Sequence, residues 1–165
     1  MSNYTRKIKN KMKKACKSGE WSQIEPLLLE HGNELASIAI DSRDDSDSED
    51  RNSDGMYGNG NTALHYIAYY APDRPASVES IKHLAGIKSV DVNKTNWMPF
   101  LLTPLHKASQ MGKVHLVEIL MRCGANPNAV DDDGYTPARW CCRHWRCNNV
   151  NKTAILSLLN NVYVY

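Results

Sequence analysis

Apolar residues recur three or four positions apart in several short stretches of the chain, with polar turns between them. Val114, Val117 and Leu120 form one such series, and Leu105 and Ala108 form another just before it. This spacing places the side chains on one face of an α-helix. The pattern therefore predicts short amphipathic helices, each of which buries one face against a neighbour.

The turns between these series carry residues that start and stop helices. The hydroxyl of Thr103 can cap a helix, and Pro104 suits the first helical position, where its missing N–H would have no partner. Gly112 and Gly124 can adopt the left-handed conformation in which helices often end. Asp133-Gly134 suits the tip of a hairpin. We expect one helix between 103 and 112, a second ending at 124, and a hairpin after it.

The same signals return along the chain at a regular interval. Thr-Pro-Leu-His begins at Thr103, and Thr-Pro-Ala-Arg begins at Thr136, 33 residues later. Thr-Ala-Leu-His begins at Thr62, 41 residues before Thr103, and "NKMKKACKSG" from Asn10 aligns with "TPLHKASQMG". A period of 33 residues with insertions predicts four copies of one helical unit.

On these residues the chain resembles the ankyrin repeat family. The family pattern is T-P-L-H-x-A, a glycine, a second helix with V/I-x-x-L-L, and then G-A-x-x-N. Residues 103–136, "TPLHKASQMGKVHLVEILMRCGANPNAVDDDGYT", match it almost throughout. The resemblance implies an all-α solenoid of helix-turn-helix units joined by short hairpin fingers.

The resemblance and the spacing together divide the chain into a single domain of about four repeats. We expect repeat 1 at about 8–40, an acidic insertion at 41–57, repeat 2 at 58–92, repeat 3 at 93–125 and repeat 4 at 126–165. The first repeat lacks Thr-Pro and is lysine-rich, and the last has an insertion. Both are therefore predicted to be caps with a solvated outer face.

Family membership would imply a non-enzymatic protein–protein interaction module that binds across a concave surface of fingers and first helices. It would also imply that His65 and His106 hydrogen-bond between neighbouring units. It implies no particular partner, because fold does not fix function. One alternative is an inhibitor of the I-kappa-B kind that masks a transcription factor. Another is a scaffold or adaptor switched by phosphorylation of the acidic segment.

The finger before Thr103 departs from the repeat. Nine residues separate Asn93 from Thr103, where seven separate Asn128 from Thr136, and "NWMPFLL" replaces Asp-Gly. These apolar side chains either fold back onto the adjacent hairpins or form an exposed hot spot for a partner. The predicted contact residues are Trp97, Met98, Phe100 and Leu101 of this finger, then Tyr66, Tyr69, Tyr70 and Lys107, and lastly Trp140, Arg143 and Trp145.

Charge is unevenly distributed, although the net charge is only +2. The first 17 residues contain Lys and Arg but no acid, and residues 41–54 contain seven acids and two arginines. The acidic segment has nothing apolar to bury, so we expect a disordered loop. It is either a solvated insertion or a regulatory loop phosphorylated at Ser42 and Ser46, which have acids three positions later. The basic segment is a solvated helix face, an import signal or a contact for an acidic partner. Its lack of aromatics beyond Tyr4 argues against direct nucleic-acid binding.

Several functional classes are disfavoured by the rest of the sequence. No apolar stretch is long enough to span a membrane, and the basic N-terminus lacks the apolar core of a signal peptide. Five cysteines, an odd number, favour reduced thiols inside the cell, in the cytoplasm or nucleus. The cluster from Cys141 to Cys147 lacks the second ligand pair of a zinc site, and Cys141 and Cys142 replace the small residues Ala108 and Ser109. We expect no catalytic residues, cofactor, metal or small-molecule substrate.

Overall fold

The computed structural model describes residues 3–36, 60–88, 90–97, 100–144 and 146–160. All regular secondary structure in these ranges is helical. The helices are α1 (Asn3–Ser18), α2 (Trp21–Ala36), α3 (Ala63–Tyr70), α4 (Pro75–Ala85), α5 (Pro104–Gln110), α6 (Val114–Arg122), α7 (Pro137–Arg143) and α8 (Asn149–Asn160). Consecutive helices pack in pairs, each of which is one helix-turn-helix unit.

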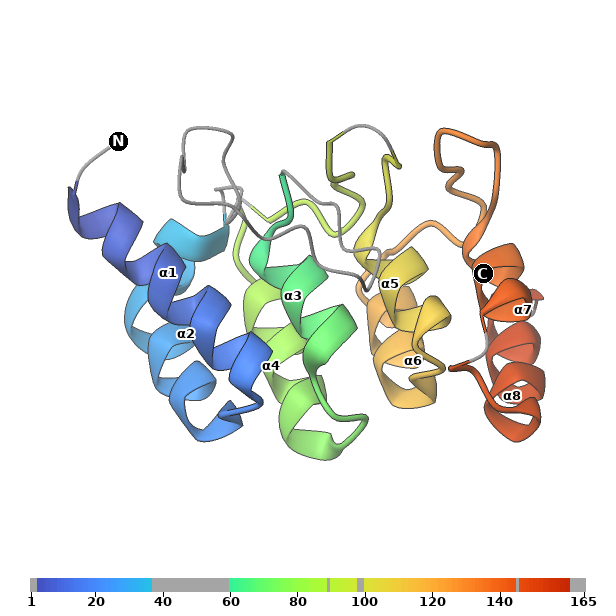
Figure 1. Cartoon of the computed structure of the whole chain (residues 1–165), viewed down its shortest axis with the longest axis horizontal. Helices are drawn as coiled ribbons and strands as arrows, with labels where there is room; N and C mark the ends of the chain where they lie inside the picture. The colour runs from blue at the N-terminus through green and yellow to red at the C-terminus, as the bar shows by residue number, and fades with distance from the viewer. Residues whose placement is uncertain (1–2, 37–59, 89, 98–99, 145, 161–165) are drawn as a thin grey trace.

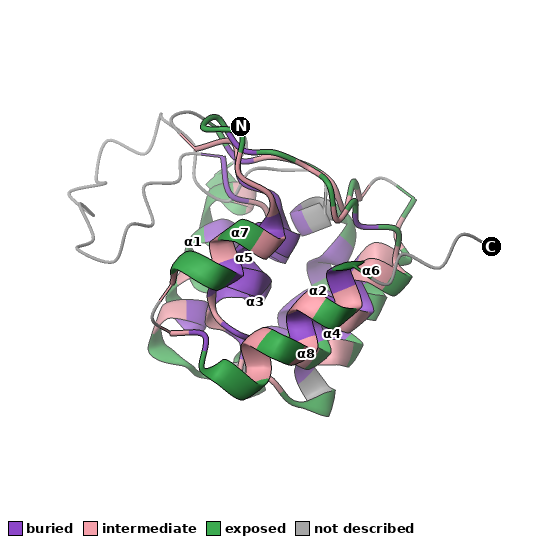
Figure 2. Ribbon diagram, turned by 90° about the vertical axis from the view of Figure 1, so that its right-hand side faces the viewer, coloured by how far each residue is buried: buried purple, intermediate pink, exposed green. Residues whose placement is uncertain are grey.

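The helix pairs stack in a row that has two layers. The first helices of the pairs, α1, α3, α5 and α7, lie side by side, and each contacts the next (Figure 1). The second helices, α2, α4, α6 and α8, form the other layer in the same order. The view along the row shows buried residues between the two layers, and the described segments that join one helix pair to the next lie along one edge (Figure 2). This arrangement confirms the predicted all-α solenoid.

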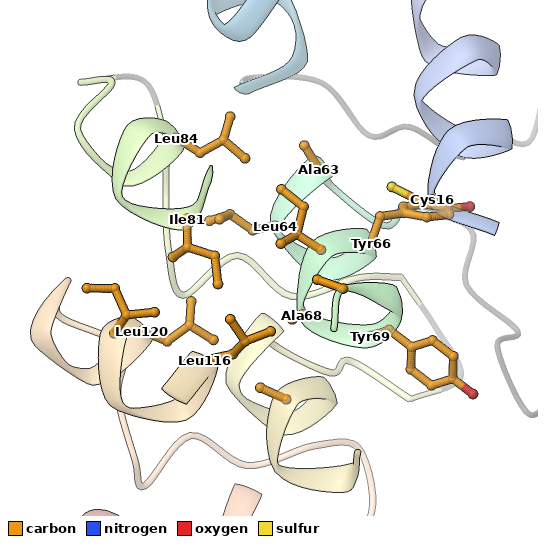
Figure 3. Close-up of a cluster of buried hydrophobic side chains, with 14 of the residues drawn as sticks. Cys16, Ala63, Leu64, Tyr66, Ala68, Tyr69, Ile81, Leu84, Leu116 and Leu120 are labelled. Carbon is orange, nitrogen blue, oxygen red and sulfur yellow. The ribbon is translucent and has the colours of Figure 1, made fainter. Parts of the chain in front are cut away.

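Aliphatic side chains from both layers fill the space between them. Leu64 of α3 meets Ile81 and Leu84 of α4, and Leu116 and Leu120 of α6 continue the same core (Figure 3). All five are almost completely buried. At about 25 cal/mol per Å² of apolar surface, the burial of such side chains is the main stabilising contribution to a small domain.

The local signals for helix ends operate as predicted in the third and fourth units. The hydroxyls of Thr103 and Thr136 accept hydrogen bonds from the backbone N–H groups of His106 and Arg139, both at 3.4 Å. Gly112 ends the first helix of its unit at a φ of +69°. A Cβ at Gly112 would lie 3.0 Å from the Cα of Cys147, so the glycine also permits close packing of the next unit.

The first unit differs from the expected one. Helix α1 begins at Asn3, more than one turn before the predicted start of repeat 1 at about residue 8. Lys and Arg are good helix formers, and Ile8 is buried together with Met12, so the extra turns still pack against the array. The predicted acidic insertion and the phosphorylation sites Ser42 and Ser46 lie outside the described residues, as do Met98 and Trp145.

Candidate interaction surface

Two buried histidines join neighbouring units, as the resemblance to the repeat family implied. The backbone N–H of Thr62 donates to Nδ1 of His65 at 3.1 Å, and Thr103 N–H donates to Nδ1 of His106 at 3.1 Å. Because Nδ1 accepts in both rings, Nε2 carries the proton. Nε2 of His65 donates to the Leu102 carbonyl at 2.8 Å, and Nε2 of His106 donates to the Tyr135 carbonyl at 3.0 Å. Each imidazole thus ties one first helix to the finger that precedes the next.

Burial keeps these imidazoles neutral. It lowers the pKa of His65 to about 3, against the opposing effect of its bond to the Leu102 carbonyl. Burial also lowers the pKa of His106. A neutral ring has one donor and one acceptor, and both are used here. The two histidines therefore position the fingers and are not candidates for proton transfer.

The unusual finger is closed at its base by Asn96. The backbone N–H of Asn96 donates to the Leu102 carbonyl at 2.9 Å, and its side-chain Oδ1 accepts from the Leu102 N–H at 2.6 Å. Its Nδ2 donates to Oδ1 of Asn61 in the preceding unit at 3.3 Å. Leu101, next to this closure, has a φ of +49°, a conformation that non-glycine residues seldom adopt. The role of Asn96 was not identified from the sequence.

The next finger uses an aspartate in the same way. Asp131 N–H donates to the Tyr135 carbonyl at 3.0 Å, and the Asp131 carboxylate accepts from Tyr135 N–H at 2.7 Å. Its other oxygen accepts from Nε1 of Trp140 at 2.7 Å. Asn96 and Asp131 are therefore equivalent closures, and the loop that starts at Asn96 is two residues longer. Trp140, a predicted contact residue, is half-buried and supports this finger.

Trp97 is partly packed and partly exposed. Its ring lies on the backbone of Gly60, where a Cβ would be only 2.5 Å from the Trp97 Cγ atom. The residue nevertheless keeps 37% of its surface exposed. Phe100 and Leu101 are half-buried, and the Phe100 carbonyl accepts from the Asp132 N–H at 3.2 Å. The finger is thus partly packed and partly exposed, and its role in binding stays a prediction.

Three residues predicted on the first helices are not at the surface. Tyr66 and Lys107 are each 1% exposed, and Tyr69 is 3% exposed. The Tyr66 and Tyr69 rings both pack on the ring of Tyr70, which is half-buried. A buried side chain cannot touch a partner in this conformation. We therefore correct the predicted set by removing these three as direct contacts. Their residue types are typical of contact surfaces, but residue type does not show which helices lie beside them.

Three cations converge on Tyr69 from separate parts of the chain. The Lys107 ammonium lies 5.4 Å from the centroid of its ring, Lys113 donates to its carbonyl, and Arg146 Nη1 donates to its hydroxyl at 3.3 Å. Burial lowers the pKa of Lys107 to about 8 and that of Lys113 to about 7. Lys113 and Arg146 could not be identified from the sequence, because nothing local links them to a tyrosine on α3.

A second cationic group lies on α7. The guanidinium carbons of Arg139 and Arg143 lie 4.9 and 4.8 Å from the ring centroid of Tyr135. Both arginines are exposed. Of the two, only Arg143 was among the predicted contact residues. Their spacing follows from the helix, because residues four apart share a face. The pair places positive charge beside the finger that Asp131 closes.

The cysteine cluster is divided between interior and surface. Cys141 and Cys147 are buried with their sulfurs 3.1 Å apart, whereas Cys142 is exposed. Burial raises the pKa of Cys141, which disfavours the reactive thiolate. Within the described ranges, no three His, Cys, Asp or Glu side chains are grouped so as to hold a metal ion. None of the described helices combines the length and apolar character that crossing a membrane requires.

Comparison with known proteins agrees with this architecture. Residues 70–162 match the family model of ankyrin repeats, in three copies. The chain is also 30% identical over 121 residues to the palmitoyltransferase AKR1 of Kluyveromyces lactis. That alignment covers 73% of this chain but only 13% of the yeast protein. Ankyrin repeats indicate a protein–protein interaction module. With its helix pairs, capped turns and histidine bridges, the chain belongs to the ankyrin repeat family.

Proposed function

We propose that this chain is a non-catalytic module that binds a protein partner through its fingers and the exposed parts of its first helices, inside the cell. The observation that carries the proposal is the finger of Trp97. Asn96 orders its base through three hydrogen bonds, yet Trp97 keeps 37% of its surface exposed. An ordered, exposed tryptophan loses little freedom when a partner covers it, which is why tryptophan dominates binding hot spots.

The neighbouring finger extends this apolar surface. Val130 is exposed, and the backbone bond between Phe100 and Asp132 joins the two fingers. Trp97 and Val130 thus belong to adjacent, connected segments that project along one edge of the array (Figure 1). Exposed apolar groups on two linked fingers suit a partner that lies across them.

The experiment compares apolar residues on the fingers with apolar residues elsewhere. Proteins that co-purify with the wild-type chain are identified, and the affinity of each is then measured with purified components. Trp97→Ala with Phe100→Ala should weaken binding by about 2 kcal/mol or more. Leu29→Ala with Val150→Ala is the control, because these side chains are 73% and 79% exposed on second-layer helices. Equal affinity of the finger variant and the wild type would refute the proposal.

Two narrower forms of this function remain hypotheses from the sequence. An I-kappa-B-like inhibitor should co-purify with a DNA-binding factor and reduce its binding to DNA. An adaptor switched through the acidic segment should lose its partner when residues 41–54 are deleted, or respond to phosphorylation at Ser42 and Ser46. Unchanged binding after the deletion would exclude the switch.

A further inference from the structure

Charge is segregated between the two layers of the array. The helices α1, α3, α5 and α7 contain ten Lys and Arg residues and no Asp or Glu, with seven of the ten in α1, one in α5 and two in α7. The helices α2, α4, α6 and α8 contain five glutamates and only three Lys or Arg. Because the first helices form one layer (Figure 1), ten of the thirteen Lys and Arg residues in the described helices belong to that layer.

The charges at the two ends of this layer are exposed. Lys7, Lys11 and Lys14 of α1 are exposed, as are Arg139 and Arg143 of α7. Between them, Lys107 of α5 is buried, and burial lowers its pKa to about 8, so its ammonium stays mostly protonated near pH 7. A buried charge is screened less by salt than an exposed one, so this ammonium adds to the potential of the layer.

Arg139 and Arg143 are especially suited to receive an anion. Their guanidinium groups share the ring of Tyr135, each within 5 Å of its centroid. In the part of the chain that the structure describes, neither forms an ion pair with a carboxylate. Guanidinium groups bind carboxylate and phosphate through paired N–H donors, so a carboxylate-bearing chain placed here would satisfy both.

We propose that the layer of α1, α3, α5 and α7 binds an acidic segment of the partner protein, with Arg139 and Arg143 as its main contacts. The proposal rests on the protein-binding function proposed above and names the chemistry of the partner. It assigns the apolar fingers and the basic helices to different parts of one interface. The fingers supply apolar contacts at the edge, and the helices supply charge that attracts and orients the acidic segment.

The observations favour an acidic protein over a nucleic acid. Proteins that bind single-stranded nucleic acid combine positive charge with open aromatic faces on which bases stack. Among the described aromatic rings of the first helices, only Tyr4, near the start of α1, is mostly exposed. Tyr66 and Tyr69 are buried against Tyr70, and the Tyr135 ring carries the two arginines. Positive charge beside a single mostly exposed ring on these helices suits carboxylates better than a series of bases, each of which needs a ring to stack on.

The test is fluorescence anisotropy with the full chain and a fluorescein-labelled polyglutamate peptide. A polyglutamine peptide of equal length and a single-stranded oligonucleotide serve as comparison probes. We expect binding of polyglutamate, none of polyglutamine, and weakening by about tenfold between about 50 and 250 mM NaCl. Arg139→Glu with Arg143→Glu should weaken binding by about tenfold or more. Lys82→Glu with Arg122→Glu makes the same charge change on α4 and α6 and should have less than a twofold effect.

Three results would overturn the proposal. The first is no binding of polyglutamate at low salt, and the second is an equal loss in the two charge-reversed variants, which would indicate only general attraction. The third is tighter binding of the oligonucleotide than of the peptide. Circular dichroism confirms that each variant is folded. A partner that requires Trp97 but tolerates both arginine changes would leave the proposed function standing and remove only this inference.

Discussion

The histidine bridge between the third and fourth units allows a quantitative prediction. In His106→Ala, the Thr103 N–H loses its acceptor and the Tyr135 carbonyl loses its donor, at distances of 3.1 and 3.0 Å. Each hydrogen bond contributes about 1 kcal/mol net, and the N–H of Thr103, which is only 2% exposed, costs about a further 1 kcal/mol when left without a partner. The space left by the fully buried ring costs about another 1 kcal/mol. The sum is about 4 kcal/mol.

This loss would be a large part of the total stability, because domains of this size unfold with about 5–15 kcal/mol. Urea titration followed by far-ultraviolet circular dichroism measures it, with an unchanged slope showing that the same surface unfolds. His115→Ala is the matched control, since that side chain is 64% exposed and bonds to Asp73 at the surface. We expect the control to lose about 1 kcal/mol or less. If His106→Ala loses no more than the control does, the bridge does not hold the units together.

Three further predictions follow from the same contacts. Gly60→Ala should displace the Trp97 ring, shift tryptophan emission to longer wavelength and destabilise the chain more than Gly134→Ala does. Both glycines have positive φ, but of the two only Gly60 lacks room for a Cβ. Equal losses of stability and an unchanged emission would contradict the contact between Gly60 and Trp97. The pKa of His65 falls from 6.5 to about 3 on folding, so below pH 6.5 the unfolded chain binds a proton that the folded chain does not. The free energy of unfolding should therefore fall by about 2 kcal/mol between pH 6.5 and about pH 5. Urea titrations that show no such loss would contradict the burial of His65. A thiol reagent should react fastest with Cys142, which is exposed, and slowly with Cys16, Cys141 and Cys147, which are buried. Rapid reaction of any of these three would contradict their burial.

Features that depend on a few consecutive residues could be predicted from the sequence. Thr103, Pro104 and Gly112 act on the backbone within one turn of their own positions, and the structure confirms each. The bridges of His65 and His106 could also be predicted, because the resemblance to a known repeat supplied the neighbouring unit that the local sequence lacks.

Features that depend on the packing of distant segments could not be predicted in the same way. Tyr66 and Lys107 have the residue types of contact surfaces, but their neighbours on adjacent helices bury them. Arg146 reaches Tyr69 across 77 positions of sequence, and no local pattern indicates that contact. In the sequence Asn96 is part of an apolar loop, yet it closes that loop with the same kind of hydrogen bonds that Asp131 makes in the next finger. Only the matching hydrogen bonds of the two fingers in the folded chain show this equivalence.

The central claim is that a protein partner covers the fingers and the first-helix layer, and hydrogen–deuterium exchange of the full chain tests it most directly. The chain is compared alone and with an excess of the protein that co-purifies with it. Binding should slow exchange in residues 94–102 and 130–143 and leave α2, α4 and α8 unchanged, because those helices lie in the opposite layer. Slowed exchange in the second layer, with none in the fingers, would contradict the account.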